Sequence, residues 1–312
     1  MSVARVATAA QNQYYLTQIQ HAGNALDKTQ GQIASGKNAN TYAGFGDKAQ
    51  VLTASIAANA RNSAYTNATK MAVTQADLQD SQLTALANLA ATLRKAVSDS
   101  VANADASALM AQAGSIFDQA AAILNSKDAN GDYIYSGGKT DVPPLTVNSL
   151  SQLAALPAVS DAFANGTDRK SVQVADGVTV SYGVAASDAA TGLMQALSDL
   201  AQFDAGPTGN FGANITGQQN AYLTGAIATT AAVATDLNNV VAQNGFVYNR
   251  LTDAQDQQAS MNTLYKSFIS DIQDTNMAEA ATQLSLNQTQ LQAALSVTAQ
   301  LNQLTLLNFL QK

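Results

Sequence analysis

Both ends of the chain are long, proline-free stretches in which apolar residues recur every three or four positions. At the N-terminus the stripe contains Leu16, Ile19, Leu26 and Ile33, with Gly23 and Gln30 as its small and polar members. At the C-terminus it contains Leu291, Leu295, Leu301, Leu304, Leu307 and Leu310, with Thr298 as a polar member. This spacing is close to that of coiled coils and indicates helices that need partner helices.

Such strong patterning is unusual for chain ends, which are commonly the frayed and polar parts of a domain. A single amphipathic helix cannot bury its own stripe. We therefore expect the two ends to pack against each other and against further copies of the chain. The apolar side chains of the two stripes are the predicted assembly interface.

The composition favours a protein that packs against other copies. Only 12% of the 312 residues are charged, 6% are aromatic, and Trp is absent. The polar residues are mostly uncharged amides and hydroxyls, which can enter a contact at a lower desolvation cost than Lys or Glu. The net charge of −7 argues against nucleic acid as a partner, because phosphate binding needs clustered Lys and Arg.

Neither a membrane protein nor a disulfide framework is expected. No segment approaches 18 uninterrupted apolar residues, so membrane insertion is not predicted. The first residues lack the basic and continuous apolar regions of a cleaved secretory signal. The absence of Cys excludes disulfides, thiolate metal sites and Cys nucleophiles.

The pattern along the chain predicts three parts. Residues 1–140 read as the N-terminal helical part, 141–217 as an inserted mixed α/β module, and 218–312 as the C-terminal helical part. All four prolines lie between 143 and 207, and an Asp176-Gly177 turn between alternating valines predicts a β-hairpin. We expect a mainly α fold, in which long terminal helices pair in an antiparallel coiled-coil bundle and carry a small α+β outer domain.

No residue cluster predicts catalysis. The turn around Asp128 has its Gly at the wrong place for a calcium loop, and Ser136 and Lys139 are separated by two glycines that disfavour the helix of a serine acyl-enzyme. His21 is the single histidine and cannot form a two-His metal site. The sequence therefore predicts no enzymatic activity, no cofactor and no metal.

The segment Gln32-Ile33-Ala34-Ser35-Gly36-Lys37 closes the first helix and resembles the N-terminal region of bacterial flagellins. The last stretch, from Gln288 to Leu310, resembles the C-terminal helix of the same family. An internal segment, Tyr133 to Leu145, is similar to a signature of the flagellin homologues that lie between hook and filament. The acidic pair that usually follows Lys37 in flagellins is missing here.

The resemblance implies a structural subunit of the bacterial flagellum, located outside the cell and exported without a cleaved signal peptide. It implies three kinds of partner: copies of the chain, other axial proteins (the hook-side adaptor and flagellin) and an export chaperone. It also implies that residues 5–34 with 285–310 form a core layer, and that 47–125 with 220–272 surround it. Ser35, Gly36 and Lys37 are the family loop.

Two alternatives stay open from the sequence. The chain could be a flagellin that forms the filament itself instead of joining it to the hook. It could also be a surface adhesin or carbohydrate-binding protein that uses the hairpin module, although the absence of Trp disfavours sugar stacking.

Overall fold

The structure is a computed structural model that describes residues 2–310, with side chains described for residues 10–300. Two compact units emerge: residues Met1–Arg61 with Met261–Lys312 form unit 1, and Asn62–Ser260 form unit 2. The helices are α1 (Ser2–Ser35), α2 (Lys48–Asn103), α3 (Leu109–Leu124), α4 (Leu150–Ala154), α5 (Ala186–Asp204), α6 (Gly217–Gln273) and α7 (Met277–Leu310). Two 3-10 turns, η1 (Tyr42–Phe45) and η2 (Val159–Ala162), and two strands, β1 (Lys170–Ala175) and β2 (Val178–Tyr182), complete the described elements.

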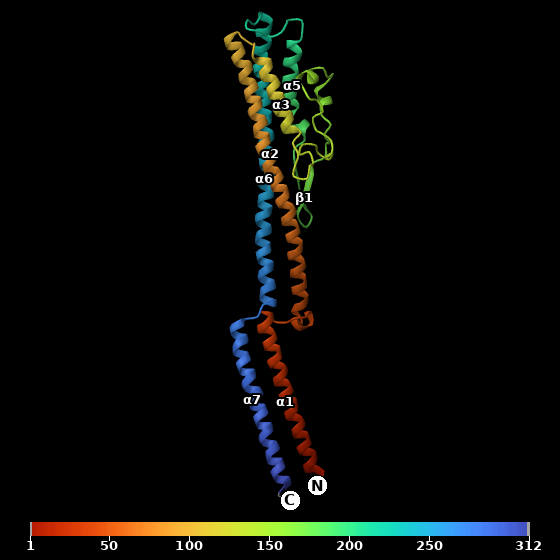
Figure 1. The fold of residues 1–312 in the computed structure, drawn as a ribbon, viewed down its shortest axis with the longest axis vertical. Coiled ribbons are helices and arrows are strands. Elements are labelled where there is room, and N and C mark those ends of the chain that lie inside the picture. The colour runs from red at the N-terminus through yellow and green to blue at the C-terminus, as the bar shows by residue number, and fades with distance from the viewer. Residues whose placement is uncertain (1, 311–312) are drawn as a thin grey trace. The chain divides into compact units, whose positions relative to one another are not determined.

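These elements confirm the predicted mainly α fold with a small α+β region. Figure 1 shows long helices at both ends of the sequence and the short elements between them. Within the described residues, no helix combines the length and the hydrophobicity needed to cross a membrane.

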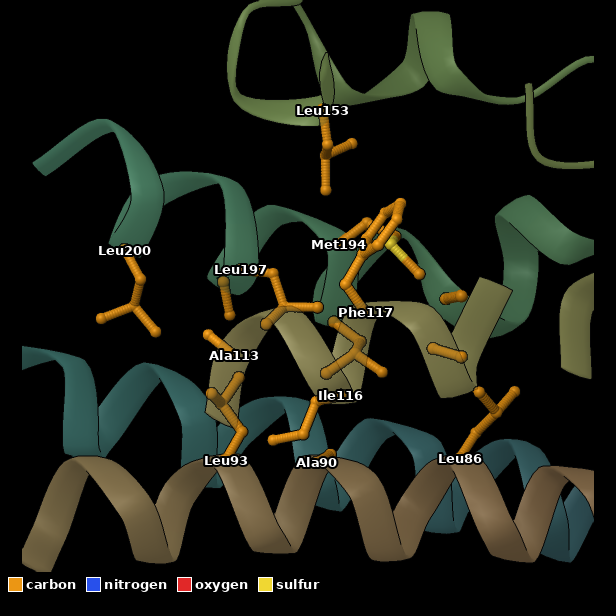
Figure 2. Close-up of a cluster of buried hydrophobic side chains, with 14 of the residues drawn as sticks. Leu86, Ala90, Leu93, Ala113, Ile116, Phe117, Leu153, Met194, Leu197 and Leu200 are labelled. Atoms are coloured by element: carbon orange, nitrogen blue, oxygen red, sulfur yellow. The ribbon is translucent and has the colours of Figure 1, made fainter. Parts of the chain in front are cut away.

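Unit 2 contains the main hydrophobic core, where α2, α3, α5 and α6 meet. Leu86 and Leu93 of α2 face Phe117 of α3 and Leu197 of α5, and all four side chains are buried (Figure 2). Alanines such as Ala90 lie between the larger side chains and let the helices approach closely. The core of unit 2 is therefore built mainly from Ala and Leu on closely packed helices.

The predicted hairpin is present. β1 and β2 pair antiparallel, and Gly177 has a positive φ of 73°, which explains the glycine in the turn. Val172 and Val180 face Leu251 of α6 in a second small core. The hairpin thus covers one side of the α2 and α6 pair with Val172, Val174 and Val180, whereas Val178 beside the turn is exposed.

The segment Tyr133-Ile134-Tyr135 is rich in residues that favour β-structure, but it forms turns and one isolated bridge. The cause is a close crossing of two loops: the Gly166 amide donates to the Ser136 carbonyl at 2.8 Å. A Cβ on Gly137, which has a φ of 62°, would lie 2.6 Å from the Gly166 carbonyl oxygen. The two glycines after Ser136 therefore permit a backbone contact and do not belong to a catalytic helix.

In unit 1, α1 and α7 lie side by side and antiparallel, so the start of α1 and the end of α7 share one end of the pair (Figure 1). The pairing of the two terminal helices predicted from their stripes is confirmed. Asp274-Thr275-Asn276 separate the last two helices, since α6 ends at Gln273 and α7 begins at Met277.

Candidate assembly surface

The terminal pair, α1 with α7, buries its predicted stripe only in part. Ile19, Leu26, Ile33 and Leu291 are half-buried. Leu16 and Leu295 remain 51% and 50% exposed, respectively. Two helices therefore leave roughly one side of each stripe uncovered. Leu301, Leu304, Leu307 and Leu310 belong to α7, but their side chains lie outside the described residues.

The seam of the terminal pair is marked by a polar contact. Asn287 of α7 donates its Nδ2 to the Ala25 carbonyl at 3.1 Å and to Thr29 Oγ1 at 2.9 Å. Thr29 is 4% exposed and Asn287 is 3% exposed, whereas the predicted seam residue Gln30 is exposed. The sequence pattern therefore assigned Gln30 to the seam, whereas the neighbouring Thr29 lies there. A buried amide that must meet its partner fixes the register of two helices.

The family loop, Ser35 to Lys37, closes α1 in a way that its sequence explains. The Gly36 amide donates to the Gln32 carbonyl at 2.8 Å, and Gly36 has a φ of 69°, as in a left-handed helix end. Ser35 Oγ donates to the Gly31 carbonyl, and Lys37 forms an isolated bridge with Asp274. Ser35, Gly36 and Lys37 thus act first as a helix stop.

Beyond this stop, residues 36–38 and 272–275 form a hydrogen-bonded contact that we call the clasp. The Asn38 amide donates to the Gln273 carbonyl, and the Thr275 amide donates to the Gly36 carbonyl. Asn38 Nδ2 donates to the Ile272 and Asp274 carbonyls, both at 3.0 Å. The clasp satisfies carbonyls at the end of α6 that have no helical partner.

Large apolar side chains remain exposed over much of unit 1. The exposed set in its described part is Tyr14, Leu16, Tyr42, Val51, Ile56, Leu264, Phe268, Met277, Leu286, Leu295 and Val297. We take this exposed set as the candidate surface for contact with other proteins. Few charges accompany them, because Glu279 is the single Asp, Glu, Lys or Arg residue of α7.

Sequence reasoning missed a second set of buried amides, in unit 2. Asn62 Nδ2 donates to the Gln258 carbonyl, and Gln258 Nε2 donates to Thr69 Oγ1 and to the Val174 carbonyl. Asn244 Nδ2 donates to the Ala76 carbonyl at 3.0 Å. The signal was present in the sequence as polar residues within the apolar face of α6. Single-sequence periodicity treats such residues as interruptions instead of contacts.

The structure places no catalytic or metal-binding geometry at the positions considered. Asp128 Oδ1 accepts the Asn130 and Asp132 amides, which is a turn, and Lys127 Nζ lies 4.5 Å from the centre of the Tyr133 ring. His21 is exposed in α1. In the described part of the chain no three acidic, His or Cys side chains gather as they would around a metal ion.

Comparisons with known proteins find similarity at the C-terminal helices and in the fold. Residues 227–310, which cover most of α6 and α7, match the family described as the bacterial flagellin C-terminal helical region. No curated protein sequence matches the chain.

Two solved structures have a similar fold. One is a Vibrio parahaemolyticus protein described as a flagellar hook-associated protein. It is 17% identical with a TM-score of 0.57, and the match covers 72% of this chain and 96% of that one. The other is FlgL of Bacillus cereus, 14% identical with a TM-score of 0.52, covering 70% of this chain and 98% of that one.

The C-terminal helices are thus similar to the bacterial flagellin C-terminal helical region. Over 72% and 70% of the chain, respectively, the fold is similar to that of the flagellar hook-associated protein and of FlgL.

Proposed function

We propose that this chain is a structural subunit of the bacterial flagellum, and specifically the protein that joins the hook to the filament. The observation that carries the proposal is the exposed apolar surface of unit 1, which has few charges and only partly buries its own stripe. The flagellin C-terminal match supports an axial protein, and the fold shared with a hook-associated protein and with FlgL supports the junction.

In this proposal the stripe residues are contacts between subunits. Leu16, Ile19, Leu26, Ile33, Leu291 and Leu295, together with the more C-terminal leucines, bury their remaining apolar area against neighbouring copies. Each square ångström removed from water contributes about 25 cal/mol, so many modest contacts produce a stiff polymer. Residues 141–217 form the outer module, and residues 1–140 with 218–312 form the axial core.

The proposed partners follow from the same role. They are copies of the chain, the hook-side adaptor, flagellin and an export chaperone, and the chain acts outside the cell after export through the flagellar apparatus. We propose no enzymatic activity. The second candidate, a filament flagellin, is favoured by the description of the family that matches residues 227–310.

Electron microscopy tests the proposal. Purified chain added to hook fragments should bind their distal ends as a short cap and should not grow into long filaments. Growth into filaments would favour the flagellin candidate, and no binding to hook ends would contradict an axial role. In a deletion strain, secretion of unpolymerised flagellin is expected for a junction protein, whereas loss of the bulk filament protein is expected for a flagellin.

A further inference from the structure

The most exposed large apolar side chain in the described part of the chain lies outside unit 1. Phe246 of α6 is 72% exposed, and Arg250, one turn later, is also exposed. At 100° per residue, Phe246 and Arg250 share one face of α6. Asn244 and Leu251 are buried against α2 and the hairpin, so Phe246 and Arg250 point to the opposite side. We call these two residues the α6 knob.

Unit 2 also has a groove of about 770 Å³ that is lined by α3, α4 and α5. Its small lining residues include Gly114, Ala154 and Ala201, so the floor is open to an inserted side chain. α4 is held over α3 and α5 by the buried Leu153, which points towards Met194 and Phe117 (Figure 2). A groove of this volume is in the range that accepts a ligand-sized group.

The edge of the groove is acidic, with Asp118 on α3 and Asp204 at the end of α5. Asp204 is occupied, because its Oδ1 accepts the Phe211 amide at 2.6 Å and its Oδ2 accepts Asn210 Nδ2 at 3.0 Å. Asp118 is exposed and belongs to neither of the ion pairs found in the described chain. It is therefore available to a cation brought by a partner.

We propose that the α6 knob of one copy docks in the α3–α4–α5 groove of the next copy, with Phe246 on the small-residue floor and Arg250 paired with Asp118. This inference rests on the proposed function and deepens it by naming a subunit contact in unit 2. The knob carries the positive charge of Arg250 and the groove the negative charge of Asp118, and each copy carries both surfaces. Such head-to-tail contacts generate rings or helical arrays rather than closed dimers.

Cysteine cross-linking tests the contact. Because the chain has no Cys, only the introduced thiols can react. Ala205→Cys places a thiol at the groove, and Ala242→Cys places one on the knob face, one turn before Phe246. Full-length chain with both changes, assembled on hook fragments and treated with a short bismaleimide, should give a ladder of oligomers. A mixture of the two single variants should stop at dimers.

The matched control pairs Ala205→Cys with Val178→Cys, an exposed hairpin position, and should give little cross-linking. In the reporting pair, Phe246→Ser or Arg250→Glu should lower cross-linking by about tenfold, as expected for a central interface residue. Combining Arg250→Glu with Asp118→Arg should restore it. If cross-linking is restored by this double charge reversal, Arg250 and Asp118 form a direct ion pair, because a second substitution would not rescue a variant that fails to fold.

Electron microscopy of the same samples separates a failure of the knob-and-groove contact from a failure of the proposed function. Assembly on hook ends without the oligomer ladder, or equal ladders from the reporting and control pairs, would overturn the knob-and-groove contact and leave the proposed function in place. Absence of assembly would contradict both.

Discussion

The two units bury their apolar residues to very different extents. Of the 42 buried apolar side chains, 40 belong to unit 2, and Leu52 and Ala280 alone belong to the described part of unit 1. Conversely, among the side chains that the structure describes, unit 1 holds 11 of the 16 large apolar ones that are exposed. Both units contain long helices. Unit 2 therefore has a large hydrophobic core of its own, and we propose that unit 1 is completed by neighbouring copies.

The contrast also separates two uses of polar residues. In unit 2 the buried amides of Asn62, Asn244 and Gln258 bond backbone carbonyls beside a large apolar core. In unit 1 the Asn287 contact and the clasp supply much of the specificity without such a core. We infer that the hydrogen bonds of unit 1 select the pairing and register of α1 and α7, and that assembly supplies the burial.

The largest effect is expected from removing part of the terminal pair. Deletion of residues 285–312 removes Asn287 and the C-terminal stripe, so the chain should stay a soluble monomer. Its thermal transition should keep the midpoint of the full chain, because the core of unit 2 is untouched. Sedimentation, electron microscopy with hook fragments and circular dichroism would measure both. Normal assembly of the truncated chain would show that the C-terminal stripe of unit 1 is not needed for contacts between copies.

A substitution in each unit should next give opposite results. Leu193→Ala in α5 removes a fully buried side chain of unit 2 and should lower the free energy of unfolding by about 3 kcal/mol. Leu264→Ala, the same change at an exposed position of unit 1, should cost less than about 0.5 kcal/mol in the monomer and should impair assembly. Urea unfolding and binding to hook ends would check the pair. Equal destabilisation by both would show that unit 1 has a core of its own.

A smaller effect is expected at the seam of the terminal pair. Asn287→Ala leaves the Ala25 carbonyl and the Thr29 hydroxyl without the amide, at a cost of about 1–2 kcal/mol to that contact. Amide exchange in α1 near Thr29 should become faster in assembled protein, since the register is less well fixed. Gln292→Ala, an exposed amide on the same helix, is the control and should leave exchange unchanged. Equal amide exchange in the two variants would show that Asn287 does not fix the register of α1 and α7.

The smallest effect concerns alkaline pH and is confined to unit 2. Burial, with a smaller contribution from Asp199, raises the pKa of Tyr222 from 10.0 to about 12. Because the folded pKa is above the unfolded one, the stabilisation is complete below pH 10 and is lost as the pH rises towards 12.

In urea unfolding, the free energy of unfolding of Tyr222→Phe should therefore fall less between those two pH values than that of the unchanged chain. An unchanged pH profile would show that this phenol does not contribute. The charge-poor terminal pair gives no reason for a comparable dependence in unit 1.

Much of the fold could be predicted from the sequence, because its local signals are strong. The hairpin follows from Asp176-Gly177 between valines, and the helix stop follows from Gly36. The conformation of Tyr133 to Tyr135 could not be predicted, since a loop crossing at Gly137 and Gly166, distant in sequence, decides it. Tertiary contacts of this kind leave no local pattern.

The candidate site was predicted less well than the fold. The stripe identifies the correct helices, but Leu295 is half exposed while the polar Thr29 is buried. Apolar spacing shows which face of a helix seeks a partner, and it does not show which polar residue enters the seam. Asn287 and Asn38 were missed for this reason: their partners are 258 and 234 residues away in the chain. The α6 knob was missed because an isolated exposed Phe has no periodicity.

Hydrogen–deuterium exchange of the full chain, as monomer and as assembled on hook fragments, tests the central claim most directly. Amides of α3 and α5 should be equally protected in both states. Those of α1 and α7 should exchange much faster in the monomer and become protected on assembly. Protection of α1 and α7 in the monomer as strong as that of α3 and α5 would contradict the claim that unit 1 is completed by its neighbours.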